Sequence, residues 1–137
     1  MKAPLFDDII NISQKIADAS ANNDEATRGL NYKELIKLCA NNDNSPKDHP
    51  LQWEALADFT LDSDQAIDIY QKGVECAQRL SLANSAASIY LAMAMRFQEM
   101  EENDKMNTYV KLLNEMLAQV TNDDLKTDIA EFTESIK

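Results

Sequence analysis

Turn-forming residues are scarce in this chain, and their scarcity restricts the fold more than any other feature. Only two glycines and three prolines occur among 137 residues, and neither Asn-Gly nor Asp-Gly is present. A β-rich fold of this length needs many tight turns, which draw on those residues and dipeptides. Apolar residues make up 45% of the chain, which is enough to build a core. The composition therefore predicts one all-α domain over residues 1–137.

Apolar side chains recur at helical spacing in seven stretches that are separated by short polar turns. The first stripe advances by four, three, four and three residues, as one face of a helix does; it consists of Leu5, Ile9, Ile12, Ile16 and Ala19. Short turns make sequential helices antiparallel. We therefore expect helical hairpins over residues 4–41, 50–81 and 82–120, followed by a capping helix over 123–137 with one narrow apolar stripe.

Several local signals set the expected helix ends. Gly29 and Asn31 weaken the first half of the second helix, so we expect it to start near Asn31. Residues 41–49 are predicted to be a loop, and Pro50 suits the first position of the third helix. We expect the helices to be capped by four polar runs, which are Asn22-Asn23-Asp24, Asp62-Ser63-Asp64, Glu101-Glu102-Asn103-Asp104 and Thr121-Asn122-Asp123-Asp124.

One segment carries a recognisable repeat pattern. Trp53-Glu54-Ala55-Leu56-Ala57 resembles the W-x-x-L-G opening of a tetratricopeptide repeat, and the run from Ala66 to Gly73 resembles its second helix. A second unit begins near Ala83, 33 residues after Pro50. The turn between the two matched helices is about three residues shorter than the family pattern, and the usual closing proline is missing. We expect Trp53 to be buried between the third and fourth helices, against Tyr70 or its neighbours.

The resemblance implies a right-handed stack of hairpins with a concave groove lined by the first, third and fifth helices. Family members that bind a C-terminal carboxylate use Lys, Asn and Arg on these helices. Here they offer Asn11, Gln14, Lys15, Gln52, Glu54, Asp58, Asn84 and Ser88. The two acidic residues of this set, Glu54 and Asp58, would repel a carboxylate, so we expect a basic or amphipathic segment instead. The predicted partner-binding residues are Glu54, Asp58, Asn84, Ser88, Asn11 and Lys15; a solvated acidic face is the alternative.

The charge of the chain narrows the range of partners. Acidic residues number 24 and basic residues 13, giving a net charge of −11. Such a field disfavours nucleic acids and anionic membranes and attracts basic proteins. Two carboxylates, Asp7 and Asp8, interrupt the start before an apolar run can build, which argues against a signal peptide or membrane anchor. Cys39 and Cys76 lie within helical patterns, and a reduced pair in a cytoplasmic protein is the preferred interpretation over a disulfide.

No residue pattern indicates catalysis, a cofactor or a metal. The only histidine, His49, has no Ser, Cys or Asp motif that would recruit it as a base, and we expect it to be an exposed loop residue. The acidic turns lack the glycine and glutamate of a calcium loop, and no phosphate-binding loop motif is present. We therefore expect a non-enzymatic protein.

Five methionines gather in the fifth and sixth predicted helices: Met93, Met95, Met100, Met106 and Met116. They are interpreted as core filling, with a flexible peptide groove as the alternative. The sequence thus favours a cytoplasmic interaction module, an adaptor or small chaperone. The alternative is a structural module that forms a homodimer.

Overall fold

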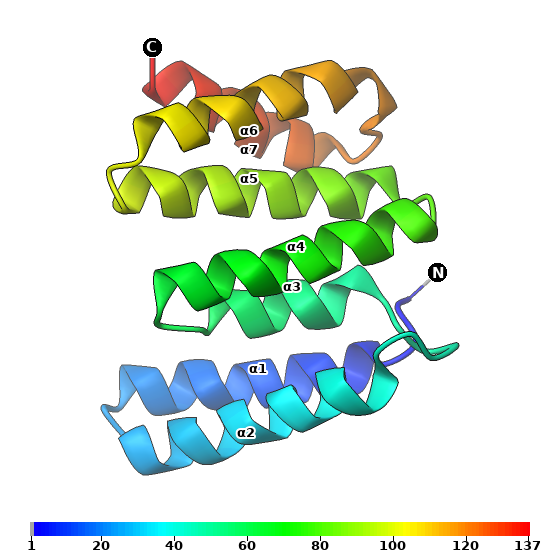
Figure 1. Cartoon of the computed structure of the whole chain (residues 1–137). Helices are drawn as coiled ribbons and strands as arrows, with labels where there is room; N and C mark the ends of the chain where they lie inside the picture. The colour runs from blue at the N-terminus through cyan, green and yellow to red at the C-terminus, as the bar shows by residue number, and fades with distance from the viewer. Residues whose placement is uncertain (1) are drawn as a thin grey trace. The chain divides into compact units, whose positions relative to one another are not determined.

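The computed structural model describes residues 2–137, and all regular structure within them is helical (Figure 1). The elements are α1 (Phe6–Ala21), α2 (Glu25–Asn42), α3 (Pro50–Asp58), α4 (Ser63–Arg79), α5 (Ala83–Glu99), α6 (Asn103–Met116), a 3₁₀ turn η1 (Leu117–Gln119) and α7 (Asp123–Ser135). The expected all-α class and the seven α-helices are confirmed. The chain divides into two compact units, one reaching to Cys76 and the other covering Ala77–Lys137. The division falls inside α4.

The first unit contains the α1–α2 hairpin (Figure 1). The Asp24 carboxylate caps α2 by accepting from the Thr27 backbone N–H at 3.1 Å. The predicted stripe is buried at Ile9, Ile16 and Ala19. The expected start near Asn31 is wrong, because α2 runs unbroken from Glu25 through Gly29. A glycine costs a helix about 1 kcal/mol, and the Asp24 cap offsets a similar amount.

Trp53 is buried, as predicted, with 6% of its surface exposed. Its buried neighbours in the core cluster come from four helices and are Ile16, Leu35, Cys39, Leu56 and Cys76. Lys72, a neighbour of Tyr70 on α4, places its Nζ 4.8 Å from the centroid of the Trp53 ring, and the Tyr70 hydroxyl donates to the Asp58 carboxylate.

The loop before α3 is tied to that core by a buried carboxylate. Asp48 is 5% exposed, and its Oδ1 accepts from Trp53 Nε1 at 2.8 Å and from Gln52 Nε2 at 2.7 Å. Its Oδ2 accepts from the Asn44 backbone N–H at 2.9 Å. Since a buried charge is costly unless hydrogen-bonded, these three donors explain why an acid is tolerated beside an indole. The predicted loop is therefore an ordered part of the first unit.

The expectation that His49 is an exposed loop residue is wrong. His49 is half-buried and forms the N-cap of α3, with its Nδ1 accepting from the Leu51 backbone N–H at 3.1 Å. Burial lowers the pKa of His49, and the neighbouring Asp48 opposes that shift. Pro50 occupies the first turn of α3 as predicted, where its missing N–H has no consequence.

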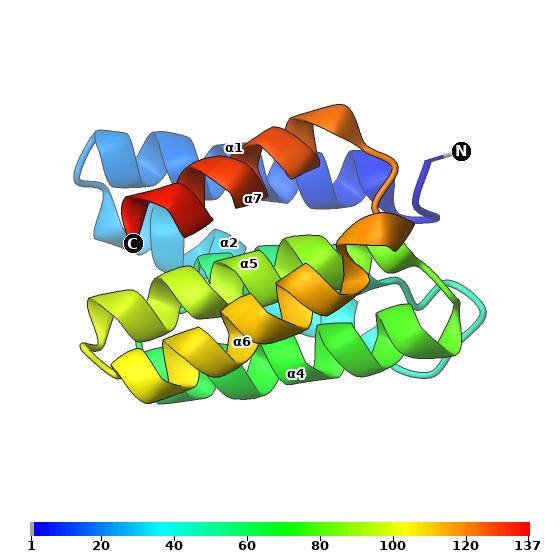
Figure 2. The ribbon, with the colours of Figure 1, turned by 90° about the horizontal axis from the view of Figure 1, so that it is seen from above.

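The second unit is built on the α5–α6 hairpin, whose two helices lie side by side in both views (Figures 1 and 2). Its aromatic rings pack in a row, with Tyr109 centred 5.5 Å from Phe97 and 5.7 Å from Tyr90. Most apolar residues of α5 are buried, and they are Ala86, Ala87, Ile89, Leu91, Met93, Ala94 and Phe97. Met95 is exposed.

Three helix–helix turns use the same backbone geometry without glycine. Asn23, Ser81 and Glu101 have φ angles of 57°, 58° and 59°. In each turn the following residue donates its N–H to a carbonyl five positions earlier, as Leu82 does to Ala77 at 2.8 Å. This is the Schellman arrangement, which usually places glycine at the left-handed position. A chain with two glycines thus makes its tight turns with other residues.

The predicted caps are confirmed at three turns and wrong at one. Asp62 Oδ1 accepts from the Gln65 N–H at 2.9 Å, and Asn122 Oδ1 accepts from the Leu125 N–H at 2.9 Å. Glu102 occupies the cap of α6 but makes no side-chain cap, and its carboxylate lies 3.0 Å from Lys105 Nζ. Glutamate is a weaker N-cap because its longer side chain is poorly placed to return to the N–H groups of the first turn.

Candidate partner-binding groove

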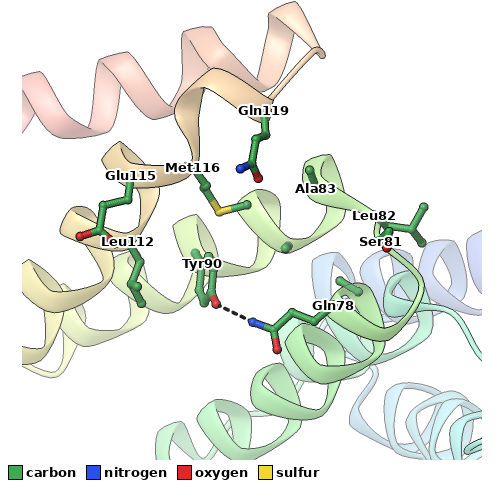
Figure 3. A pocket seen from close by; sticks show the side chains of 11 residues that line it. Gln78, Ser81, Leu82, Ala83, Tyr90, Leu112, Glu115, Met116 and Gln119 are labelled. Carbon is green, nitrogen blue, oxygen red and sulfur yellow. Dashed lines mark hydrogen bonds between the residues drawn. The ribbon is translucent and has the colours of Figure 1, made fainter.

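A hollow of about 450 Å³ lies in the second unit (Figure 3). It is lined by the last turn of α4 and the turn after it (Ala77, Gln78, Ser81, Leu82), by α5 (Ala83, Ala86, Tyr90), and by α6 with η1 (Leu112, Glu115, Met116, Gln119). We call it the α5–α6 groove. Its volume falls within the range of ligand-binding pockets.

Each of the two long walls follows from helical periodicity. The lining residues of α5 stand at i, i+3 and i+7, and those of α6 and η1 stand at i, i+3, i+4 and i+7. Residues at these spacings share one face of a helix. Small alanines line the α5 wall, while Leu112 and Met116 line the facing wall, with the Met116 thioether directed towards α5 (Figure 3). The groove is therefore a trough between two antiparallel stripes of side chains.

The row of aromatic rings positions the Tyr90 hydroxyl at the edge of the groove. Tyr90 is held against Tyr109 and accepts from Gln78 Nε2 at a long 3.4 Å (Figure 3). Burial raises the pKa of Tyr109, and the neighbouring Tyr90 hydroxyl adds to the shift. Tyr109 therefore stays neutral at physiological pH, and the hydroxyl of Tyr90 gives the groove a polar edge.

One ionisable acid, Glu115, stands at the rim of the groove, and no Lys, Arg or His is among the lining residues. Glu115 is exposed, and its carboxylate makes no hydrogen bond or salt bridge within residues 2–137. Lys111 lies one turn earlier on α6 and does not pair with it. The charged residues of Ala77–Lys137 number 10 acidic and 6 basic, a net charge of −4. The rim therefore favours a cationic ligand group.

The six predicted partner-binding residues lie outside this groove. Asn11 and Lys15 are exposed on α1, and Glu54 and Asp58 stand one turn apart on α3, half-buried and exposed respectively. Asp58 accepts from the Tyr70 hydroxyl. Gln52, expected on the same surface, is fully buried beside Asp48. Glu54, Asp58 and Gln52 thus already have partners inside the fold.

The two predicted residues of the second unit lie on α5. Asn84 accepts at Oδ1 from the Thr121 N–H at 2.9 Å, and its Nδ2 donates to Thr121 Oγ1 at 2.9 Å. It also accepts from the Asn122 N–H at 3.3 Å. Asn84 therefore holds the segment that leads into α7, while Ser88 is half-buried.

Sequence reasoning missed most of the groove because its residues are unremarkable one by one. Met116 was interpreted as core filling, with a flexible peptide groove as the alternative. The available signal was the helical register of Leu112, Glu115, Met116 and Gln119, a mixed stripe that fits neither a core face nor a solvent face.

The methionines divide between core and surface. Met93 and Met106 are buried in the core, Met95 is exposed, and Met116 lines the groove. Neither of the two interpretations of the cluster therefore holds for all of its members.

Comparison with known proteins returns no relative. No family model matches the chain, and no curated protein or solved structure matches it. Within residues 2–137, no group of His, Cys, Asp or Glu is arranged to hold a metal ion, and no helix is long and apolar enough to cross a bilayer.

Proposed function

We propose that the protein is a non-enzymatic interaction module, an adaptor or small chaperone, that binds a segment of another protein in the α5–α6 groove. The observation that carries the proposal is the groove itself, two facing stripes with an uncompensated carboxylate at the rim. Such a site suits an apolar side chain flanked by a cation. The groove uses α5, one of the three helices that the tetratricopeptide resemblance assigns to partner binding. We include the right-handed, tetratricopeptide-like stacking in the proposal.

The reactive side chains support a non-enzymatic role. Burial, with smaller contributions from Asp48 and Asp43, raises the pKa of the Cys39 thiol to about 12. Its Sγ donates to the Gln52 carbonyl at 3.3 Å, so it is a poor nucleophile at physiological pH. His49 uses its Nδ1 to cap α3. Neither cysteine forms a disulfide and both are buried, which supports our proposal of a reducing, cytoplasmic location.

Site-specific photo-crosslinking tests the proposed function. p-Benzoylphenylalanine replaces Gln119, which lines the groove, or Asp128, which is exposed on α7 and serves as the control. We expect position 119 to capture one defined segment, which then binds the purified protein in isolation. Equal capture from both positions, or a captured segment that does not bind in isolation, would contradict the proposal.

A homodimer is the second candidate, and one observation favours it. Ile10 on α1 and Ile36 on α2 are 44% and 42% exposed. Both lie 13 residues from Asn23, so they stand at the same height of the antiparallel hairpin. Light scattering on the wild type and on Ile36→Glu separates the two candidates. A wild-type dimer that becomes a monomer in Ile36→Glu would support self-association. A wild-type protein that is monomeric at all concentrations would support a foreign ligand.

A further inference from the structure

The dimensions of the α5–α6 groove set the length of its ligand. The α5 wall extends from Ala83 to Tyr90, and the facing wall from Leu112 to Gln119, so each wall covers seven residue-to-residue steps. At 1.5 Å per residue, each wall is about 10 Å long. Because a helical turn rises 5.4 Å, the groove accommodates about two turns of a helix lying along it.

The walls favour a helical ligand over an extended one. An extended segment leaves its backbone N–H and C=O groups to be paired by the site. The groove offers few polar side chains for this, chiefly Gln78, Ser81 and Gln119, while its other lining groups are mostly apolar. A helix satisfies its own backbone, and the small side chains Ala83 and Ala86 allow it to approach α5 closely.

The Glu115 carboxylate at the rim of the groove indicates which ligand side chain lies beside it. Glu115 is the only carboxylate among the lining residues and makes no salt bridge within the described chain. A Lys or Arg on the ligand, one turn from its apolar anchors, would pair with it. Met116 can adjust its thioether to anchors of different shape.

On the basis of the proposed function, we infer that its ligand is an amphipathic helix of about two turns, which binds in the α5–α6 groove. The helix places apolar side chains at i and i+4 between Ala86 and Met116, and a Lys or Arg beside Glu115. These features define a class of partner segment, a short cationic helix.

Selection from an unbiased displayed library tests the inference. The peptides are about 16 residues long, because shorter isolated helices are marginally stable, and carry no bias in charge or conformation. We expect the selected sequences to share apolar residues at i, i+4 and i+7 and at least one flanking Lys or Arg. Acidic or proline-containing extended peptides that still crosslink to position 119 would overturn the inference and leave the proposed function standing. A selection that enriches no groove-binding peptide would overturn both.

A charge swap locates the cation. Glu115→Lys is compared with Glu131→Lys, which makes the same change of charge at an exposed position of α7 outside the groove. For the best selected peptide we expect Glu115→Lys to weaken binding about fivefold to tenfold, since it replaces an attraction by a repulsion, and Glu131→Lys to change it less than twofold. A Lys→Glu version of the peptide should recover binding only to the Glu115→Lys protein. Equal effects of the two variants, or no recovery, would show that Glu115 does not contact the ligand.

Discussion

The two units of this chain solve the same packing problem with different chemistry. The first places a buried carboxylate, Asp48, beside Trp53 and satisfies it with donors from three residues. The second fills its centre with a row of aromatic rings and leaves a hollow along one side, with Glu115 unpaired at the rim. Polar groups that are fully paired specify a structure, whereas polar groups left unpaired beside apolar surface are available to a ligand.

The largest effect is expected from removing the indole of the first unit. Trp53→Ala leaves a cavity in the core cluster and removes one of the three donors to the Asp48 carboxylate. We expect the free energy of unfolding to fall by about 3–5 kcal/mol, measured by denaturant titration. Trp53→Phe, which keeps most of the volume and removes only the N–H donor, should cost clearly less. A loss below about 1 kcal/mol for Trp53→Ala would show that the indole does not stabilise the core of the first unit.

Removing the carboxylate tests whether the loop before α3 is held by polar pairing. Asp48→Ala removes the acceptor of two buried donors, those of Gln52 and Trp53, and of the part-buried backbone N–H of Asn44. We expect a loss of about 2–4 kcal/mol, because each unsatisfied buried group costs about 1–3 kcal/mol and the site relaxes in part. Hydrogen exchange should accelerate first in α3. A stability equal to that of the wild type would mean that Asp48 contributes nothing beyond its volume.

Protonation of His49 should destabilise the first unit at mildly acid pH. The folded state lowers the pKa of His49 below its usual 6.5, and only the neutral ring offers Nδ1 to the Leu51 N–H. Its contribution is therefore complete above pH 6.5 and is lost as the pH falls through the lower folded value. We expect a loss of less than about 1 kcal/mol, since the ring is partly solvated.

His49→Asn is the matched control, because asparagine caps a helix without titrating in this range. Stability measured between about pH 7.5 and pH 5 should fall more for the wild type than for the variant. Parallel curves would show that the cap does not depend on the protonation state of His49.

The smallest effect concerns the turns, which also differ between the units. Asn23 in the first unit and Ser81 in the second adopt the same left-handed geometry, but asparagine tolerates it better than serine. Ser81→Gly should therefore stabilise the protein by about 0.5–1 kcal/mol, and Asn23→Gly by less. Thermal unfolding of both variants measures this order. An equal gain would show that the residue types do not distinguish the two turns.

The helices follow from the sequence to a large extent, because their apolar stripes are long and regular. The burial of Ile9, Ile16, Trp53 and Leu56 and the caps at Asp24 and Asn122 were predictable from spacing and local side-chain chemistry. The start of α2 was not predictable, because helix propensity includes the cost of Gly29 but not the tertiary contacts that stabilise the helix. One such contact is the bond from Arg28 Nη2 to the Phe59 carbonyl at 2.7 Å.

The candidate site was less predictable, since it depends on which faces remain uncovered once the helices pack. Asn84 illustrates this. Its position on α5 suggested a partner contact, yet its amide is used to hold Thr121, 37 residues away. No local pattern reveals such a pairing, and none reveals that Glu115 stays unpaired while Glu102, also on the α5–α6 hairpin, meets Lys105.

Methyl NMR with the best selected peptide tests the central claim most directly, because the methionines report on separate environments. Met116 lines the groove, whereas Met93 and Met106 lie in the core of the same unit and Met95 is exposed on α5. On titration with the peptide, we expect the Met116 and Ala86 methyl signals to shift with a common binding curve and those of Met93, Met95 and Met106 to shift little. Shifts that leave Met116 unchanged while the peptide binds would place the ligand elsewhere and contradict the account.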